Sequence, residues 1–257
     1  MFAIYKKELS SYFNSALGYI ILALYLFFSG YFFYFCCFLR AQNGLVYVVS
    51  NMITIVLFLV PLITMRSFAE EKRQHTDQAL ITAPVGLNEI VLGKYLSALT
   101  LYGICNLVYF IYAFMLAAIS DNVVLFGAVA ESGQVAVPWA HLLWSMLGSV
   151  LVGAALLSVN LWFSSLTEHQ IIAAVLGLAS GLFIMLFDAI VSIVENFIGA
   201  VFNTTYTVVV LDKLSVTGYY QSFVNGIVSP VGVVFFVCWI AFFLFLTNRV
   251  LDRKRWA

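Results

Sequence analysis

The densest group of charged side chains in this 257-residue sequence lies at 70–77, where eight positions hold five of the 24 Lys, Arg, Asp and Glu residues. The Thr76 hydroxyl can cap a new helix, Asp77 then lies favourably at its positive end, and the Ala83-Pro84 step ends it. This pattern predicts a helix of about two turns that a soluble partner could bind. The simpler interpretation is that the charges only solvate a loop and orient the chain.

Two further patterns suggest ligand chemistry, but each lacks a necessary part. A phosphate-binding loop needs about four residues between its glycines and a hydroxyl residue after the lysine. Here six residues separate Gly86 from Gly93-Lys94, and Tyr95 follows. His141 and His169 lack the spacing of metal ligands. The chain is therefore expected to bind neither ATP nor a metal, and no catalytic residue is predicted.

Asp188 is the one acidic residue inside an apolar stretch, and Glu195 follows it on the same helical face. Ionisable residues at membrane depth often mark an ion or substrate route. About 27 Å of helix would separate Gln170 from Asp188, which places Asp188 close to the far membrane surface. A hydrated outer vestibule or a contact with an external segment is therefore favoured over a proton relay.

The composition restricts the class of protein to integral membrane proteins. Hydrophobic residues make up 63% of the chain, charged residues make up 9%, and the mean hydropathy is +1.03. A soluble enzyme and a disulfide scaffold are excluded, and the net charge of zero gives no reason to expect a nucleic-acid partner. Apolar stretches long enough to form membrane-spanning helices lie at about 16–39, 45–65, 89–119, 139–163, 170–194 and 229–248.

The basic residues predict the orientation of these six spans. With the N-terminus inside, ten Lys and Arg residues fall on the cytoplasmic side and two fall outside, so both termini are placed in the cytoplasm. Residues 1–15 are predicted to form an interfacial helix, although they could simply be a positively charged anchor. The largely apolar segment 195–228 is predicted to form short external helices that enter the membrane and return. A surface-lying loop is the alternative.

Two stripes of small residues repeat every four positions, one in each of the spans 139–163 and 170–194. Such stripes let helices approach closely. Packing within one chain is the simpler interpretation, and a seam between two chains is the more specific one. The stripes are Ser145, Ser149 and Gly153 in the first span and Ala173, Gly177 and Gly181 in the second.

The sequence RSFAEEKRQHTDQALITAPV at 66–85, followed by EIVLGK at 89–94, resembles the signature of the type-2 ABC transporter permeases. Members of that family carry an acidic pair, a basic residue, Gly-Thr, a Leu-rich turn, Ala-Pro-Val and Gly-Lys. YYQSFVNGIV at 219–228 and FLTNRVL at 245–251 resemble the branch linked to gliding motility and to nitrous-oxide-reductase accessory proteins. His75 departs from the family pattern, which has glycine at this position.

The resemblance implies a single all-α integral membrane domain over 1–257. It would have six transmembrane helices, an N-terminal interfacial helix, a cytoplasmic coupling helix within 67–87 and external re-entrant helices in 195–228. Two permease chains would pair, each docking on a separate ATP-binding subunit that holds ATP and magnesium. Family dimers use spans one and five, which points to the second small-residue stripe. The implied contacts with the ATP-binding subunit are Glu70, Glu71, Arg73, Thr76, Asp77, Leu80 and Ile81.

The function implied is ATP-driven export of a hydrophobic or amphipathic molecule across the bacterial cytoplasmic membrane, by a chain that is not itself an enzyme. Relatives of the gliding branch often work beside an accessory extracytoplasmic protein, which is a further expected partner. Two alternatives remain. One is a secondary transporter or channel, and the other is a membrane anchor that transmits force without transport.

Overall fold

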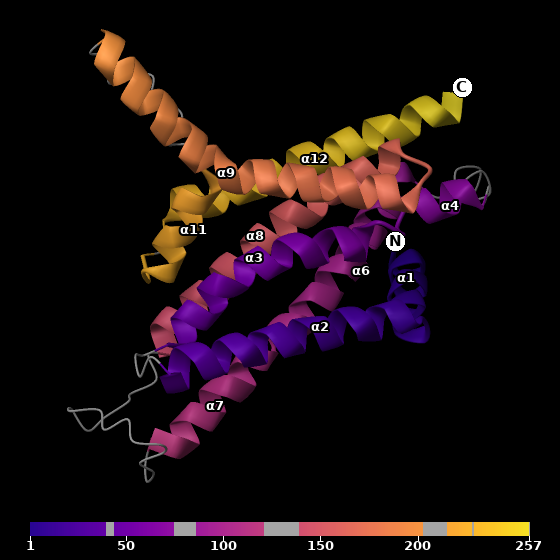
Figure 1. The fold of residues 1–257 in the computed structure, drawn as a ribbon. Helices are drawn as coiled ribbons and strands as arrows, with labels where there is room; N and C mark the ends of the chain where they lie inside the picture. The colour runs from indigo at the N-terminus through magenta and orange to yellow at the C-terminus, as the bar shows by residue number, and fades with distance from the viewer. Residues whose placement is uncertain (40–43, 75–85, 121–138, 203–214, 228, 257) are drawn as a thin grey trace.

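The computed structural model describes residues 1–39, 44–74, 86–120, 139–202, 215–227 and 229–256, with helices as the regular elements (Figure 1). Its description of side chains leaves out 119, 120, 188, 192, 194–202, 254 and 256. The helices are α1 (Phe2–Asn14), α2 (Ala16–Phe33), the π-helix η1 (Tyr34–Leu39), α3 (Leu45–Thr64), α4 (Ala69–Arg73), α6 (Leu87–Asn106), α7 (Val108–Ser120), α8 (Trp139–Leu166), α9 (Gln170–Phe202), α11 (Val216–Val224) and α12 (Pro230–Trp256).

Six segments of the described chain are long and apolar enough to cross a membrane, which confirms the prediction of an all-helical protein with six candidate spans. Each overlaps one of the predicted ranges. They are Ala16–Leu39, Leu45–Arg73, Leu87–Ala118, Trp139–Leu166, Gln170–Phe187 and Pro230–Arg253.

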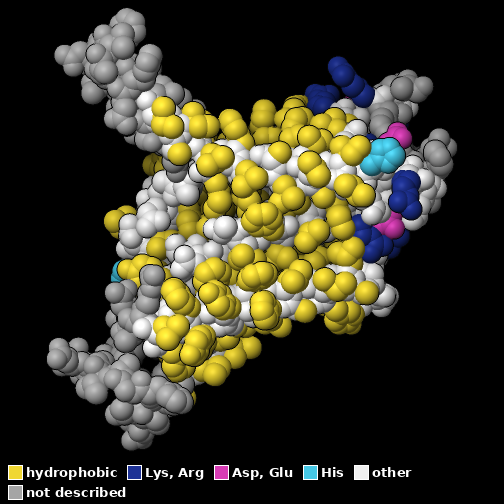
Figure 2. Space-filling view, viewed as in Figure 1, with side chains coloured by type: hydrophobic (Ala, Val, Ile, Leu, Met, Phe, Trp, Pro, Cys, Tyr) yellow, Lys and Arg dark blue, Asp and Glu magenta, His cyan; other side chains and the backbone are white. Residues whose placement is uncertain are grey.

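The spans surround α8, which is the most buried of the six and packs against α3, α6, α9, α11 and α12. Successive spans run in opposite directions, so the N- and C-termini lie at the same end of the bundle (Figure 1). The face drawn in Figure 2 is apolar along its length, and its charged side chains gather at the end that holds α4 and both termini. This is the distribution expected of a bundle whose sides face lipid.

α1 turns away from α2 at Ser15, whose backbone is extended (φ −102°, ψ 148°). Gly18 permits the turn, because a Cβ atom there would lie 2.3 Å from the carbonyl oxygen of Tyr12. Gly93 has a similar role where α1 crosses α6, since a Cβ atom would lie 3.1 Å from the Ile4 side chain. Two glycines therefore let α1 pack closely across the charged end of the bundle.

Two helices extend beyond their predicted ranges. α9 continues to Phe202, into the range 195–228 that was assigned to external helices, because no proline interrupts its 33 residues. α12 continues to Trp256 rather than ending near 248, since Thr247 and Asn248 do not interrupt the helix. Within 215–227 the described helix is α11, which packs on α8 and α9.

Both stripes of small residues pack inside the chain, as the simpler interpretation expects, and a seam between two chains at the second stripe stays a prediction. A Cβ atom on Gly153 would strike the ring of Tyr102 at 2.1 Å. On Gly177 it would lie 1.8 Å from Asn160 Oδ1, and on Gly181 it would lie 2.8 Å from Leu57. The close approach that small residues allow is therefore taken up by α3, α6 and α8 of the same chain. Ala173, the third member of the second stripe, is also buried.

Candidate coupling site

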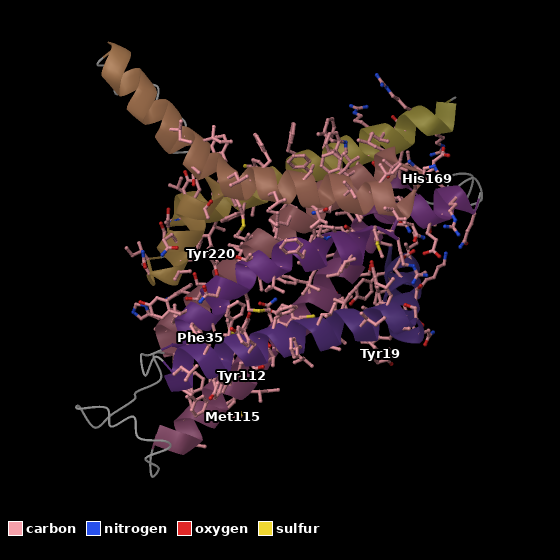
Figure 3. All side chains as sticks on the ribbon, viewed as in Figure 1. Tyr19, Phe35, Tyr112, Met115, His169 and Tyr220 are labelled. Atoms are coloured by element: carbon pink, nitrogen blue, oxygen red, sulfur yellow. The ribbon has the colours of Figure 1, made fainter. Side chains whose placement is uncertain are left out.

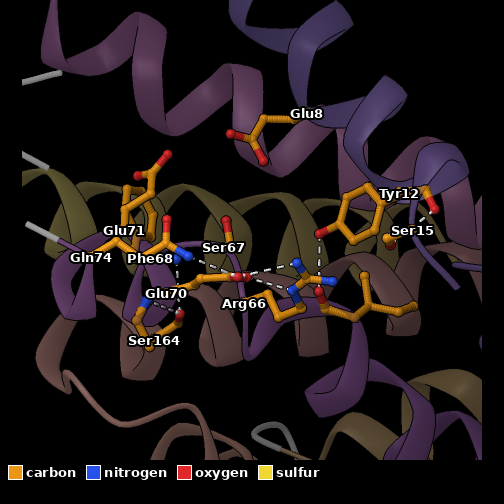
Figure 4. A network of polar contacts seen from close by, with 12 residues as sticks. Glu8, Tyr12, Ser15, Arg66, Ser67, Phe68, Glu70, Glu71, Gln74 and Ser164 are labelled. Carbon is orange, nitrogen blue, oxygen red and sulfur yellow. Dashed lines mark hydrogen bonds and ion pairs between the residues drawn. The ribbon is translucent and has the colours of Figure 1, made fainter. Parts of the chain in front are cut away.

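α4 is a five-residue helix whose start is bound to the end of α8. The Ser164 hydroxyl accepts hydrogen bonds from the backbone N–H groups of Phe68 and Ala69, at 3.2 and 3.3 Å (Figure 4). In a continuous helix these groups would bond within α3, so Ser164 supplies the acceptor that lets the helix break and restart. Lys72, which is buried, donates to the carbonyl oxygen of Ser165. α4 is thus attached to α8 at two points.

Lys94 joins α4 to two further helices. Its side chain is 1% exposed, and its ammonium group lies 2.9 Å from Glu8 Oε1, 2.8 Å from Glu71 Oε1 and 2.6 Å from the carbonyl oxygen of Ser67. The ring of Phe68 lies 5.0 Å away. An ammonium group has three donors, and three oxygens surround this one. Because these oxygens belong to α1, to the turn after α3 and to α4, Lys94 ties all three to α6.

α1, which was predicted only as an interfacial helix, presents polar groups to the bundle. Tyr5 shares a hydrogen bond with Thr100 at 3.1 Å, and the Tyr12 hydroxyl donates to the carbonyl oxygen of Ile63 at 2.9 Å (Figure 4). Burial, reinforced by the charge of Glu8, raises the pKa of Tyr12 well above its ordinary value. The phenol therefore remains protonated and keeps donating to the end of α3.

A second ion pair lies in the turn itself. Arg66 Nε contacts Glu70 Oε2 at 2.5 Å, Arg66 Nη2 contacts Oε1 at 3.2 Å, and Gln74 donates to the same carboxylate (Figure 4). A two-point contact fixes the guanidinium as well as the carboxylate. The formal charges of the site balance, because three acids face three bases. They are Glu8, Glu70, Glu71, Arg66, Lys72 and Lys94.

The structure places three of the seven predicted contact residues. Glu70 and Glu71 form ion pairs within the chain, and their contact with an ATP-binding subunit stays a prediction. Arg73 is exposed at the end of α4. The other four, Thr76, Asp77, Leu80 and Ile81, lie outside the described residues.

Sequence reasoning missed the residues that hold α4 in place. The signal for Lys94 was a single lysine inside a predicted span, and the signal for Glu8 was a single acid on a basic helix. The sequence does not show that Glu8 and Lys94 pair with each other, because 86 residues separate them. Ser164 and Ser165 gave no signal, since serine is common near the ends of membrane helices.

Elsewhere in the described chain, no group of three His, Cys, Asp or Glu side chains could hold a metal ion. The side chains of Asp188 and Glu195 fall outside the description, so their predicted outer-vestibule role stays a prediction. A cavity of about 20 Å³ lies between α3, α8, α9 and α11, and its lining includes Leu57, Leu156 and Tyr220. This volume holds about one water molecule, and it is far smaller than that of a site for a drug-sized ligand.

Comparison with protein families gives a match to the family described as ABC-2 family transporter protein, over residues 6–241. Comparison with curated proteins gives no match. The family match covers the turn after α3, the α4 site, the first five candidate spans and the first half of the sixth. The chain is therefore a multi-pass membrane protein that belongs to the ABC-2 transporter family, whose members are the permease components of ABC transporters.

Proposed function

We propose that this chain is the permease subunit of a bacterial ABC exporter in the branch linked to gliding motility and nitrous-oxide-reductase accessory proteins. Two permease chains pair, and separate subunits bind and hydrolyse ATP with magnesium. Each ATP-binding subunit docks on the segment 67–87 at the charged end. The chain itself does no catalysis, and an accessory extracytoplasmic protein is a further candidate partner.

The observation that carries this proposal is the attachment of α4 to the spans on two sides. Ser164 and Lys72 bind α4 to the end of α8, and Lys94 binds it to α1 and α6. A push on residues 75–85 would reach α4 directly along the chain. Because packed helices joined by paired polar groups move as a unit, the displacement would pass on to three helices.

The proposed cargo is hydrophobic or amphipathic. Among the described side chains, the spans carry no charged group outside the charged end of the bundle. A small ion crossing such a bundle would lose its hydration without a charged partner, which costs much free energy. A lipid-like molecule needs no such lining.

The charged end is proposed to face the cytoplasm, with α1 along the inner membrane surface and the protein in the cytoplasmic membrane. α11 would then lie at the outer end, as one of the re-entrant helices expected before the last span. Its Tyr220 hydroxyl donates to the carbonyl oxygen of Val49 at 3.1 Å, which draws this helix in against α3.

The test is purification of the tagged chain in mild detergent, with and without the double change Asp77→Arg and Leu80→Asp. We expect a stoichiometric ATP-binding subunit and its ATP hydrolysis to accompany the unaltered chain, and both to be lost with the variant. The reason is that one change reverses a charge and the other puts a charge into the contact.

The control makes the same kinds of substitution elsewhere on the charged end. It combines Leu166→Asp, at the exposed end of α8, with Glu168→Arg in the turn that follows. This variant should retain the ATP-binding subunit. If the 77/80 variant keeps its partner and its ATPase, the docking assignment is wrong. A chain that purifies without any nucleotidase would instead support a secondary transporter or an anchor.

A further inference from the structure

The third span is broken near its middle, between α6 and α7. The Leu107 N–H bonds to the carbonyl of Ile104 at 3.2 Å, and the Phe110 N–H bonds to that of Leu107 at 3.1 Å. Both bonds reach back three residues along the chain, whereas those of a continuous α-helix reach back four. Proline is a common cause of such a break, but 87–120 contains no proline.

Asn106 lies directly before the break, as the last residue of α6. It is 2% exposed, and its Nδ2 donates to the carbonyl of Tyr102 at 2.9 Å. Its Oδ1 accepts from Ser149 of α8 at 3.2 Å and lies 3.5 Å from the hydroxyl of Tyr25 of α2. Backbone that leaves the helical pattern at membrane depth needs polar partners of this kind. Asn106 therefore anchors the break and touches two neighbouring spans there.

Before the break, the third span is attached to α8. The Tyr95 hydroxyl donates to the carbonyl of Ala154 at 3.2 Å, and the Tyr102 hydroxyl lies 3.0 Å from the Ser149 hydroxyl. Gly153 leaves room for the Tyr102 ring to pack directly on α8. α6 and α8 thus form one closely packed pair.

After the break, the described side-chain hydrogen bonds of α7 are made with α2 instead. Tyr25 donates to the Tyr109 hydroxyl at 2.9 Å, and Ser29 shares a hydrogen bond with Tyr112 at 3.0 Å. The Tyr112 ring also stacks on Phe33, with 4.4 Å between ring centroids, and Figure 3 shows Tyr112 in this region. The side-chain hydrogen bonds of the span therefore change from α8 to α2 at Asn106, while α7 also packs on α3 and its Phe114 ring meets Trp139 at the start of α8.

The half beyond the break also has the features of a movable element. Ile111 and Met115 of α7 are exposed on the side of the bundle, where lipid is expected, and the exposed Phe114 has the Trp139 ring of α8 5.6 Å away between ring centroids. α2 changes to the π-helix η1 directly after Phe33, and π-turns are frequent at functional sites.

We propose that Asn106 is the pivot of the third span, about which α7 and the far half of α2 move together against the α6–α8 pair. Asn106 is a positioning residue. Its hydrogen bonds keep the polar groups at the break paired while the two halves of the span change their angle. The link of this motion to ATP rests on the proposed function. The pivot itself rests only on the geometry of the break.

The experiment measures distances between spin labels on a cysteine-free background. One pair joins Phe114 of α7 to Leu143 of α8 across the moving half, and a second joins Leu92 of α6 to Leu166 of α8 across the fixed half; all four are exposed. We expect the first distance to shift between the nucleotide-free and the vanadate-trapped complex, and the second to stay constant. Asn106→Leu should abolish the shift.

The matched control is Asn51→Leu, because Asn51 makes the same bond to its own helix, to Tyr47 at 2.9 Å, in the unbroken α3. This variant should keep the shift. A third label pair, on Tyr31 and Phe114, should keep a constant distance in the unaltered chain. Its distance distribution should broaden in the double variant Tyr109→Phe and Tyr112→Phe. This double variant replaces Asn106→Leu as the test if Asn106→Leu does not fold.

The pivot is wrong if the α7–α8 distance is as constant as the α6–α8 distance, or if Asn106→Leu leaves its shift intact. If no ATP-binding subunit is found, the proposed function fails, and the pivot is tested on the chain alone in lipid nanodiscs. There the α7–α8 distribution should be broader than the α6–α8 distribution and should narrow with Asn106→Leu. Equal widths would overturn the pivot independently of any nucleotide.

Discussion

At the scale of single residues, Lys94 has the largest expected effect on stability, because one buried ammonium group serves two carboxylates. Replacing Lys94 with Met leaves Glu8 and Glu71 facing each other without a cation. Breaking a buried ion pair by removing one partner costs about 3–5 kcal/mol. We expect a clear fall in the unfolding temperature in detergent, and release of α1 from α4, measured as faster hydrogen exchange in residues 2–14.

The control for Lys94 separates charge from packing. The triple variant Lys94→Met, Glu8→Gln and Glu71→Gln removes the unpaired charges while keeping similar side-chain volumes, so most of the lost stability should return. If the triple variant is as unstable as Lys94→Met alone, packing of the lysine stem decides the effect, and the ion pairs contribute little.

Gly177 gives a second prediction at this scale. A Cβ atom there would lie 1.8 Å from Asn160 Oδ1, whereas at Gly103 nothing lies within 4 Å. Gly177→Ala should therefore push α9 away from α8 and cost about 1–3 kcal/mol, as overpacked sites do. Gly103→Ala should cost nothing, and thermal unfolding of the two variants compares them directly. Equal stabilities would mean that α9 is not held where the structure places it.

At the scale of elements, the position of α4 depends on a cap that comes from another helix. Ser164→Ala removes the acceptor for two N–H groups, and a lost cap costs about 1 kcal/mol. We expect faster hydrogen exchange at 68–74 and weaker coupling of ATP hydrolysis to the permease. Ser158→Ala is the matched control, because that buried hydroxyl bonds only within α8, to Ala155. Similar exchange in both variants would contradict the cap.

The spans could be predicted from the sequence, and their internal breaks could not. A run of about 20 apolar residues can satisfy its backbone in the membrane only as a helix, so the six ranges follow from hydropathy. No proline marks the break at Leu107, and the polar partners of Asn106 beside it, Ser149 and Tyr25, come from distant parts of the chain. For the same reason the small-residue stripe that contains Gly177 could be recognised in the sequence, whereas Asn160, which packs against Gly177, could not.

The candidate site was predicted only in part, because local charge density shows where a turn lies and not which way its side chains point. The resemblance implied that Glu70 and Glu71 contact the ATP-binding subunit, which stays a prediction, and nothing in the sequence indicated that they pair with Arg66 and Lys94 of the same chain. Long-range ion pairs decide that direction. The exposed Arg73 is left as the described residue of α4 best placed for docking.

At the scale of the whole molecule, the charge distribution predicts how the protein sits in the membrane. The exposed basic side chains at Lys6, Lys7, Arg73, Arg249 and Arg253 belong to α1, α4 and the last turns of α12. These elements meet at the end that holds both termini (Figures 1 and 2). Because basic residues are retained on the cytoplasmic side during insertion, this end should face the cytoplasm.

The orientation can be measured with single cysteines introduced on a cysteine-free background. Glu168 is exposed in the turn between α8 and α9 at the charged end, and Ile227 is 65% exposed after α11 at the opposite end. A membrane-impermeant maleimide should label Ile227→Cys in intact cells and Glu168→Cys only after permeabilisation. The reverse pattern would place the charged end outside, where no ATP is available to drive a docked subunit, and would exclude the exporter arrangement. Labelling of both positions in intact cells would contradict a chain that crosses the membrane between them.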